Sequence, residues 1–353
     1  MKLLAIDGNS ILNRAFYGIR PLSNTQGVFT HAIFGFMNIY LKNRDEVQPD
    51  AVAVAFDLRK PTFRHKAVAT YKANRKGMPE ELAMQLPYVK QLLTLLGIPV
   101  ITCEGYEADD ILGTLAAACT AQDADCVILT GDRDSLQLVS DHVTVRLTTN
   151  KETIPYTPER FQEEYGFAPL SLIDLKALMG DSSDNISGVA GVGQKTASKL
   201  IQAWGTVENL YAHLDEAGLT KSVYNKLTAG QDAAKESKWL ATIVTDVPID
   251  MDVQHYLPQP VQTEEVRRLL LELEMAKLLE KLKLSGTDAP APEAAEPAEQ
   301  QPLTEQPLTA ALLDTWRADK TELPCCLFDG SRICVYHAGT PESVYTSTDT
   351  ALW

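Results

Sequence analysis

Acidic residues that follow short apolar runs are the residues of this sequence with the clearest chemical potential. Three runs end this way: Asp7 follows residues 3–6, Asp57 follows residues 51–56, and Asp132 and Asp134 follow residues 126–129. Runs of this length and apolar content predict buried strands of a parallel sheet. Ligands of open α/β sheets bind beyond the carboxyl ends of the strands, so we expect these acids to share one site.

Five further acids join the same predicted site, and no His or Cys accompanies them. The complete set is Asp7, Asp57, Glu107, Asp109, Asp110, Asp132, Asp134, Asp181 and Asp184. Carboxylates crowded into one pocket raise one another's pKa, so protons or cations must neutralise them. Oxygen-only ligands favour Mg²⁺ or Mn²⁺. Two such ions about 3.5–4 Å apart can activate a water and stabilise the leaving oxygen of a phosphodiester. The set therefore predicts hydrolysis of a phosphate ester.

Each acid also has an ordinary structural interpretation. A single aspartate after a strand, such as Asp7, is often a helix cap or a turn residue. Acids in the first turn of a helix, as Glu107, Asp109 and Asp110 would be, complement the helix dipole. The coincidence of four acidic segments, three at strand ends, favours the metal site. Adjacent Asp109 and Asp110 cannot both point the same way on a helix, so one of them acts as an outer partner or a cap.

A glycine-rich segment, residues 188–196, superficially resembles an ATP-binding P-loop. Gln194 separates Gly193 from Lys195 and no strand precedes the segment, so it fails that pattern. Backbone N–H groups at a helix N-terminus can still hold a DNA phosphate without reading the base sequence. The alternative is a plain turn between two helices.

A basic segment from residue 58 to 79 carries seven Lys or Arg and no acid. Aromatic residues and an asparagine lie among these charges, a mixture suited to a single-stranded nucleic acid. Lys72 and Arg75 would lie one turn apart and face the same phosphate if the segment were helical. The alternative is a solvated charged surface.

The remaining pattern predicts an α/β fold, a parallel sheet flanked by helices, followed by a mainly helical region. We expect helices at residues 84–96, 111–119, 172–179 and 194–204, and one long amphipathic helix at 263–284. Residues 289–306 are dominated by Ala, Pro, Glu and Gln, which predicts a disordered linker.

Composition sets further bounds. A net charge of −15 argues against a nucleic-acid partner, but the basic segment shows that the charge is unevenly distributed. The six cysteines form no C-x-x-C pair, so neither a zinc site nor a disulfide framework is indicated. We find no signal-peptide pattern and no membrane-spanning run, so we expect a cytoplasmic protein.

The motifs resemble, in order and spacing, the 5′ nuclease (flap endonuclease) domain of bacterial DNA polymerase I. The segments that carry this resemblance are Asp7-Gly-Asn-Ser, Phe56-Asp57, Tyr71-Lys-Ala-Asn-Arg75, Gly105-Tyr-Glu-Ala-Asp-Asp110, Thr130-Gly-Asp-Arg-Asp134, Leu178-Met-Gly-Asp-Ser-Ser-Asp-Asn185 and Gly188-Val-Ala-Gly-Val-Gly-Gln-Lys-Thr-Ala197. The resemblance covers residues 1 to about 284.

The resemblance implies a PIN-like catalytic domain at residues 1–170 with a helical arch at about 59–80, and a helix-hairpin-helix DNA-binding region at 171–284. It implies that Asp7, Asp57, Glu107 and Asp109 hold one divalent ion, that Asp132, Asp134, Asp181 and Asp184 hold a second, and that Asp110 lies close by. It also implies a K⁺ ion at the hairpin. Lys72, with Arg75, would act on the scissile phosphate. The expected DNA contacts are Arg64, Tyr71, Lys72, Arg75, Gly188, Gly191, Gly193, Lys195 and Thr196.

The expected partner is DNA with a 5′ flap, a nick or a primer end, bound by a monomer. After a linker at 285–308, residues 309–353 would begin a 3′-5′ exonuclease-like domain. Asp329-Gly-Ser there lacks the Asp-x-Glu of proofreading, and the chain ends before a polymerase domain. Two alternatives stay open, a metal-dependent phosphatase on the same fold and a catalytically idle DNA-binding module.

Overall fold

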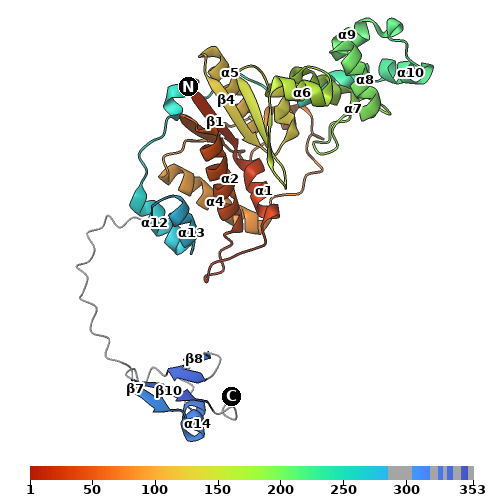
Figure 1. Ribbon diagram of the computed structural model, residues 1–353. Coiled ribbons are helices and arrows are strands. Elements are labelled where there is room, and N and C mark those ends of the chain that lie inside the picture. The colour runs from red at the N-terminus through yellow and green to blue at the C-terminus, as the bar shows by residue number, and fades with distance from the viewer. Residues whose placement is uncertain (285–303, 319–324, 329–331, 337–342, 349–353) are drawn as a thin grey trace. The chain divides into compact units, whose positions relative to one another are not determined.

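A computed structural model of the chain describes residues 1–284, 304–318, 325–328, 332–336 and 343–348 (Figure 1). The chain forms two compact units, Met1–Ser285 and Gly286–Trp353. We describe each unit by itself.

The first unit is built on a six-stranded sheet in the order β3-β2-β1-β4-β5-β6. Its strands are β1 Lys2–Asp7, β2 Ala51–Ala55, β3 Val100–Ile101, β4 Asp125–Thr130, β5 Val143–Thr148 and β6 Thr153–Tyr156. The first five strands run parallel and β6 pairs antiparallel with β5. The predicted parallel sheet is therefore confirmed, and β1 and β4 lie side by side in its middle. Their carboxyl ends, Asp7 and Thr130, open on the same edge.

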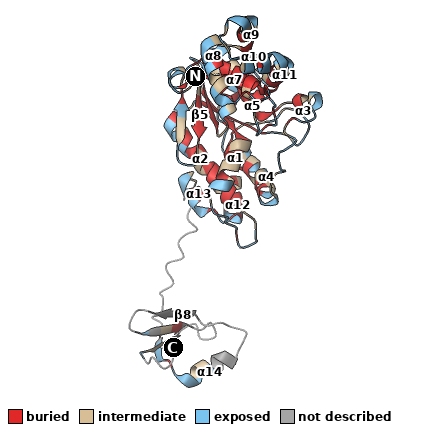
Figure 2. Cartoon of the chain, turned by 90° about the vertical axis from the view of Figure 1, so that its right-hand side faces the viewer, coloured by how far each residue is buried: buried red, intermediate tan, exposed pale blue. Residues whose placement is uncertain are grey.

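Helices cover both faces of this sheet because alternate strand residues point to opposite sides. Leu4 and Ile6 of β1 pack into one core with helices α1 Gly8–Gly18, α2 His31–Val47 and α4 Glu80–Leu95. Leu3 and Ala5 pack into the other core with α5 Ala108–Ala121. Figure 2 shows buried residues along the strands and on the sides of these helices that face them.

Helices dominate the chain after β6, as predicted. They are α6 Pro158–Tyr165, α7 Leu172–Met179, α8 Gln194–Trp204, α9 Val207–Ala212, α10 Lys221–Ala229, α11 Gln231–Ala241, α12 Thr263–Glu272 and α13 Ala276–Lys281. Helices α7 and α8 begin and end where the sequence predicts. In Figure 1, α7 to α10 extend away from the sheet.

The single long helix predicted at residues 263–284 is wrong. The chain forms α12 and α13 instead, and Glu274 between them has a left-handed φ of 57°. The break is fixed by tertiary contacts, because the Glu274 carboxylate accepts hydrogen bonds from the backbone and the hydroxyl of Thr25. The turn therefore ties α12 and α13 to the loop between α1 and α2.

The arch segment, residues 59–80, is mostly irregular rather than helical. It contains one short helix, α3 Phe63–Ala67, followed by turns. Lys72 has a φ of 55°, so Lys72 and Arg75 do not lie one helical turn apart, which corrects the helical expectation. The segment is instead held against residues 182–185. The Lys72 N–H donates to the Asp184 carbonyl at 2.9 Å, and the Asn74 and Asn185 amides donate to the carbonyls of Ser182 and Thr70, both at 2.7 Å.

The second unit contains a four-stranded sheet in the order β7-β10-β9-β8. Its described elements are β7 Thr304–Pro307, α14 Ala310–Ala318, β8 Cys325–Phe328, β9 Ile333–Tyr336 and β10 Ser343–Ser347. Cys326 lies in β8, whereas Asp329 lies outside the described residues. Most of the predicted linker at 285–308 also lies outside them, but its end forms β7, so the linker prediction is wrong there.

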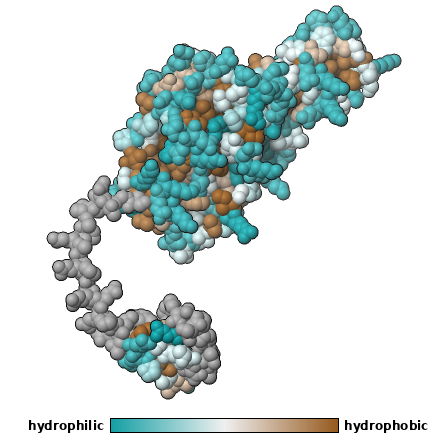
Figure 3. Space-filling view, viewed as in Figure 1, coloured by the Kyte–Doolittle hydropathy of each residue, from teal (hydrophilic) through white to brown (hydrophobic). Residues whose placement is uncertain are grey.

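Hydrophilic side chains predominate on the face of the first unit seen in Figure 3, with small apolar areas between them. Among the described residues, no helix has the length and apolar content that a membrane span requires.

Candidate active site

A cleft of about 550 Å³ opens at the carboxyl edge of the sheet. Five of the predicted acids line it: Asp7, Asp57, Glu107, Asp109 and Asp132. Lys72 and Arg75 of the arch segment line it as well. The strands bring the acids together, because β1, β2 and β4 are neighbours that deliver their carboxyl ends to one place. Asp132, which the resemblance would assign to the second ion, thus shares a wall with the acids of the first.

Asp7 lies at the centre of this edge and is almost fully buried. Its carboxylate accepts hydrogen bonds from the Ser10 N–H at 2.9 Å and from the Thr130 hydroxyl at 2.8 Å. Burial, together with the charges of Asp57 and Asp132, raises the pKa of Asp7 to about 7. These two hydrogen bonds hold the carboxylate in place. A nearby cation would stabilise its ionised form, which burial and the neighbouring acids disfavour.

Asp57 and Asp109 extend the acidic wall. The Asp57 carboxylate accepts a hydrogen bond from the Ala108 N–H at 2.8 Å, which joins the end of β2 to the start of α5. Burial raises the pKa of Asp57, and burial with the charges of Asp7 and Asp132 raises that of Asp109 well above its usual value. Each pKa rise means that the ionised form is disfavoured unless a cation is near.

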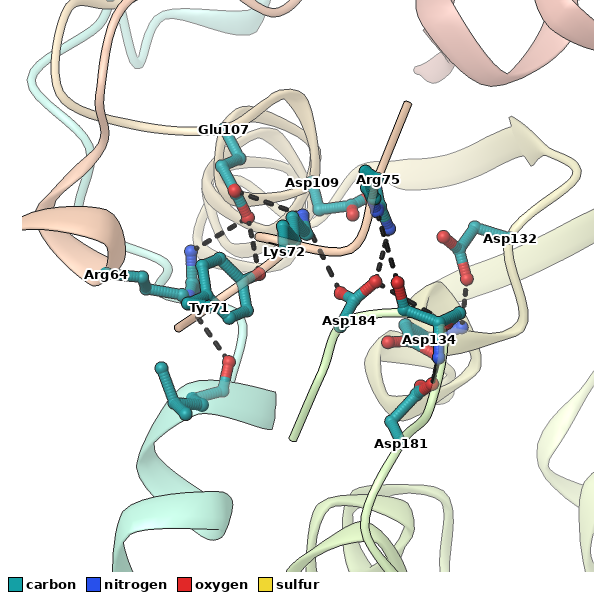
Figure 4. Close-up of polar contacts among 12 residues, drawn as sticks. Arg64, Tyr71, Lys72, Arg75, Glu107, Asp109, Asp132, Asp134, Asp181 and Asp184 are labelled. Atoms are coloured by element: carbon teal, nitrogen blue, oxygen red, sulfur yellow. Dashed lines mark hydrogen bonds and ion pairs between the residues drawn. The ribbon is translucent and has the colours of Figure 1, made fainter. Parts of the chain in front are cut away.

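Arch cations occupy part of this acidic site (Figure 4). The Lys72 ammonium lies 3.0 Å from the Glu107 carboxylate and 3.6 Å from that of Asp184. Arg75 pairs directly with Asp184. The three charged elements, the start of α5, the arch segment and the loop after α7, therefore meet at these side chains.

Asp134 and Asp181 lie on the other side of Asp184, and a lysine that the sequence did not single out joins them. The Lys176 ammonium pairs with Asp134 and lies 2.5 Å from the Asp181 carboxylate, although Lys176 is buried in α7. Burial and the nearby Asp132 charge raise the pKa of Asp134 to about 7. Burial would also raise the pKa of Asp181, but hydrogen bonds from Lys176 and Ser183 outweigh it and lower that pKa to about 2.

The residues present fit divalent ions. The donors are carboxylate oxygens, the ligands of Mg²⁺ and Mn²⁺, and four of the acids have raised pKa values that a cation would reverse. Among the described residues, no group of three or more acidic side chains is placed so that it could hold a metal ion as it stands. Lys72, Arg75 and Lys176 stand between them and supply the positive charge in this structure.

Lys176 should therefore weaken divalent-ion binding. We expect Lys176→Met to enlarge the rise in thermal midpoint that Mg²⁺ produces, because Asp134 and Asp181 lose their ammonium partner and gain more from an ion. Lys238→Met is a matched control, since Lys238 pairs with Asp174 and Glu208 outside this site. Differential scanning fluorimetry over a Mg²⁺ series measures the effect. An equal rise in both variants would contradict this role.

Two residues expected to contact DNA are turned inward. Arg64 is 2% exposed, and its guanidinium donates two hydrogen bonds of 2.8 Å to Asp110 and others to the carbonyls of Leu240 and Thr242. Tyr71 is also buried, with its hydroxyl donating to Glu107 at 3.0 Å. We correct both assignments, because neither side chain has a free face for phosphate or base.

Asp110 likewise departs from the predicted metal set. It is fully buried, binds Arg64 on both oxygens and accepts a hydrogen bond from the Glu107 N–H at 3.1 Å. Asp109 faces the acids while Asp110 faces Arg64. The two side chains therefore point in different directions, as adjacent residues of a helix must. Asp110 holds the start of α5 in place and is corrected to a supporting role.

The glycine-rich loop joins α7 to α8. Gly188 is buried, whereas Gly191, Gly193 and Lys195 are exposed and Thr196 is partly exposed at the start of α8. The exposed N-terminal turn of α8 could receive a phosphate, so DNA contact by Gly191, Gly193, Lys195 and Thr196 stays a prediction. Gly188 is buried, so close packing rather than DNA contact explains the glycine at this position.

Gly188→Ala should destabilise the first unit by at least about 2 kcal/mol. Gly188 has a φ of 62°, and an added Cβ would lie 2.2 Å from the Gly180 nitrogen. Gly193→Ala is the control, because nothing lies within 4 Å of its added Cβ and its φ is −92°. Urea unfolding measures both, and we expect Gly193→Ala to change stability by no more than about 0.5 kcal/mol. Similar losses in the two variants would contradict this explanation.

A parallel sheet with acids gathered beyond its carboxyl edge, followed by a helical region, agrees with a resolvase-like domain followed by a SAM fold. Two family models match the chain over adjoining ranges. They are the N-terminal resolvase-like domain of 5′-3′ exonuclease at residues 2–166 and its C-terminal SAM fold at residues 167–264. The chain therefore belongs to the 5′-3′ exonuclease family.

Curated relatives agree with this family. DNA polymerase I of Caldicellulosiruptor bescii is 43% identical over 289 residues, and that of Bacillus subtilis 41% over 297. These matches cover 81% and 84% of this chain but 34% of either relative. The chain spans about a third of the length of the curated relatives it matches.

Solved structures share the fold. T5 5′-exonuclease with bound divalent metal ions (zinc) has a TM-score of 0.55 at 23% identity, covering 77% of this chain and 99% of that one. The catalytic core of Rad2 in complex with DNA substrate has a TM-score of 0.54 at 17% identity, covering 80% and 92%. At these identities the likeness concerns the fold.

Proposed function

We propose that this chain is a structure-specific 5′ nuclease that hydrolyses DNA phosphodiesters with divalent metal ions, as the N-terminal part of a DNA polymerase I. One observation carries the proposal: acids from three strand ends line a single cleft together with Lys72 and Arg75 of the arch segment. Acids without cations would repel a phosphodiester, and cations alone would bind it without cutting. Both together suit metal-assisted hydrolysis.

The side chains divide the work. Asp7, Asp57, Glu107, Asp109 and Asp132 would hold one ion, and Asp134, Asp181 and Asp184 a second, as Mg²⁺ or Mn²⁺. When bound, such ions supply an activated water and stabilise the leaving oxygen. Lys72 contacts both Glu107 and Asp184, and its ammonium can move to the phosphate that enters between them. Arg75 accompanies it and neutralises the charge that develops on the phosphate.

The proposed substrate is DNA with a 5′ flap, a nick or a primer end, including an RNA primer, in replication and repair. Residues 1–170 would form the catalytic domain and 171–284 the helix-hairpin-helix region, where the α8 N-terminus grips the phosphate backbone and a K⁺ ion can assist. We propose a cytoplasmic monomer. Residues 309–353 would begin a 3′-5′ exonuclease-like domain.

Two other functions compete with this one. A metal-dependent phosphatase needs the acids but neither the arch cations nor the exposed turn of α8. An idle DNA-binding module would bind more tightly without the acids, so their presence in the cleft argues against it.

A 5′-labelled flap DNA tests the function. With Mg²⁺ we expect cutting near the flap junction, and EDTA should abolish it because the acids then lack their ions. Mn²⁺ added after EDTA removal should restore cutting. Binding without cutting at any metal concentration would identify the idle module. Release of phosphate from small esters but not from DNA would identify the phosphatase.

A further inference from the structure

Three aromatic side chains meet on the surface where α3 of the arch segment contacts α11. Phe63 at the start of α3 contacts Tyr106, with ring centroids 5.7 Å apart, and contacts Trp239 of α11 edge-to-face at the same distance. We call Phe63, Tyr106 and Trp239 the aromatic platform. Figure 2 shows α3 beside α11 on one side of the first unit, in agreement with these contacts.

The platform is open to solvent. Trp239 is 43% exposed, and Phe63 and Tyr106 are partly exposed. Tryptophan that stays half-exposed at the end of an aromatic cluster leaves a large apolar face uncovered, which suits a flat ring from a ligand. None of these three residues lines the acidic cleft.

Positive charge lies next to the platform. Lys60 and Lys66 are exposed on the same segment as Phe63. Lys60 donates a hydrogen bond of 2.7 Å to Glu104, two residues from Tyr106, and this bond, with the charge of Lys66, lowers the pKa of Glu104. Two cations against one acid leave this rim positive, as a phosphate backbone would require.

Two platform residues are adjacent in sequence to residues at or beneath the acidic cleft. Tyr106 precedes Glu107, whose carboxylate faces Lys72 in the cleft while Tyr106 faces Phe63. Phe63 precedes Arg64, which binds Glu107 and Asp110 beneath the platform. Tyr106 and Phe63 are thus direct chain neighbours of Glu107 and Arg64, which form a buried ion pair at 3.3 Å.

We propose that the aromatic platform binds the unpaired 5′ strand of a nucleic acid whose phosphodiester lies in the acidic cleft, by stacking a base on Trp239 and holding phosphates at Lys60 and Lys66. The site rests on the proposed nuclease function, since it extends that substrate beyond the cut. Aromatic faces next to cations bind single strands with little base preference, because every base has a stacking face. We therefore expect that an unpaired 5′ strand too short to extend from the acidic cleft to Trp239 does not contact the platform.

Binding of two flap substrates in EDTA, where nothing is cut, tests the site. One DNA carries a 5′ flap of about twelve nucleotides, within the range that single-strand sites cover, and the other a flap of about two. Fluorescence anisotropy gives Kd for the wild type, Trp239→Ala, Trp239→Phe and the control Leu271→Ala, which removes another exposed large apolar side chain, from α12.

We expect Trp239→Ala to weaken binding of the long flap about tenfold, the order of one lost stack, and Trp239→Phe to retain most of the affinity. Binding of the short flap should stay within about twofold, the scale of a surface change without specific contacts. Unchanged binding of the long flap, or equal losses on both flaps, would overturn the proposal. A long-flap effect in a chain that cuts neither DNA with Mg²⁺ would support the platform and contradict the nuclease function.

Discussion

Asp132→Ala should lower the rate of flap cleavage at saturating Mg²⁺ by at least about a hundredfold, since even residues outside the first ligand shell usually cost about 10–100-fold. Asp132 lines the cleft with Asp7 and Asp109, and its charge contributes to the raised pKa of both. The variant removes a carboxylate that we propose as an ion ligand. Single-turnover cleavage of a labelled flap measures the loss.

Control variants separate chemistry from folding. Asp132 caps the short helix at Arg133–Leu138 by accepting a hydrogen bond from the Asp134 N–H, so its removal should cost about 1 kcal/mol of stability. DNA binding should persist or strengthen because one negative charge is gone. Asp141→Ala, which removes an exposed acid elsewhere, should cut normally. Cleavage by Asp132→Ala within threefold of the wild type would remove Asp132 from the metal site.

Arg64→Met should lower the free energy of unfolding by about 3–5 kcal/mol, because it leaves the fully buried Asp110 without its partner. Replacing both residues, as Arg64→Met with Asp110→Leu, should recover much of that loss, since no buried charge then lacks a counter-charge. Urea unfolding of the two single variants and the double variant measures this coupling.

The same variants test the correction of Arg64 from a DNA contact to a structural residue. The folded fraction of the double variant should bind flap DNA with nearly the affinity of the wild type. A stable Arg64→Met variant with weakened DNA binding would instead restore Arg64 to the DNA interface.

The sequence was sufficient for the elements with strong local signals. The strands β1 and β4 and the helices α7 and α8 follow from apolar runs bounded by glycine or acid. The gathering of acids at one sheet edge follows from the strand order, because parallel strands share a carboxyl edge. In β5 the apolar residues alternate with Thr144, Arg146 and Thr148, and β3 and β6 have only two and four residues. The sequence therefore offers no comparable apolar run for these three strands.

Tertiary contacts decided the rest. The sequence shows seven cations at residues 58–79 but not that Arg64 turns inward, since that depends on Asp110 and on carbonyls of Leu240 and Thr242. One signal in the sequence could have indicated Lys176, a lysine in the largely apolar helix α7 five residues before Asp181. The break at Glu274 depends on Thr25, which is remote in sequence.

The hydrogen bonds between the arch segment and residues 182–185 couple these two segments, so that a displacement of one is expected to displace the other. The Lys72 N–H is held by the Asp184 carbonyl while the Lys72 ammonium neutralises the Asp184 carboxylate. A ligand that draws either group away also loosens the other. Ion binding at Asp184 and detachment of the arch segment are therefore coupled equilibria. The factor by which detachment changes the ion affinity equals the factor by which the ion changes the equilibrium constant for detachment.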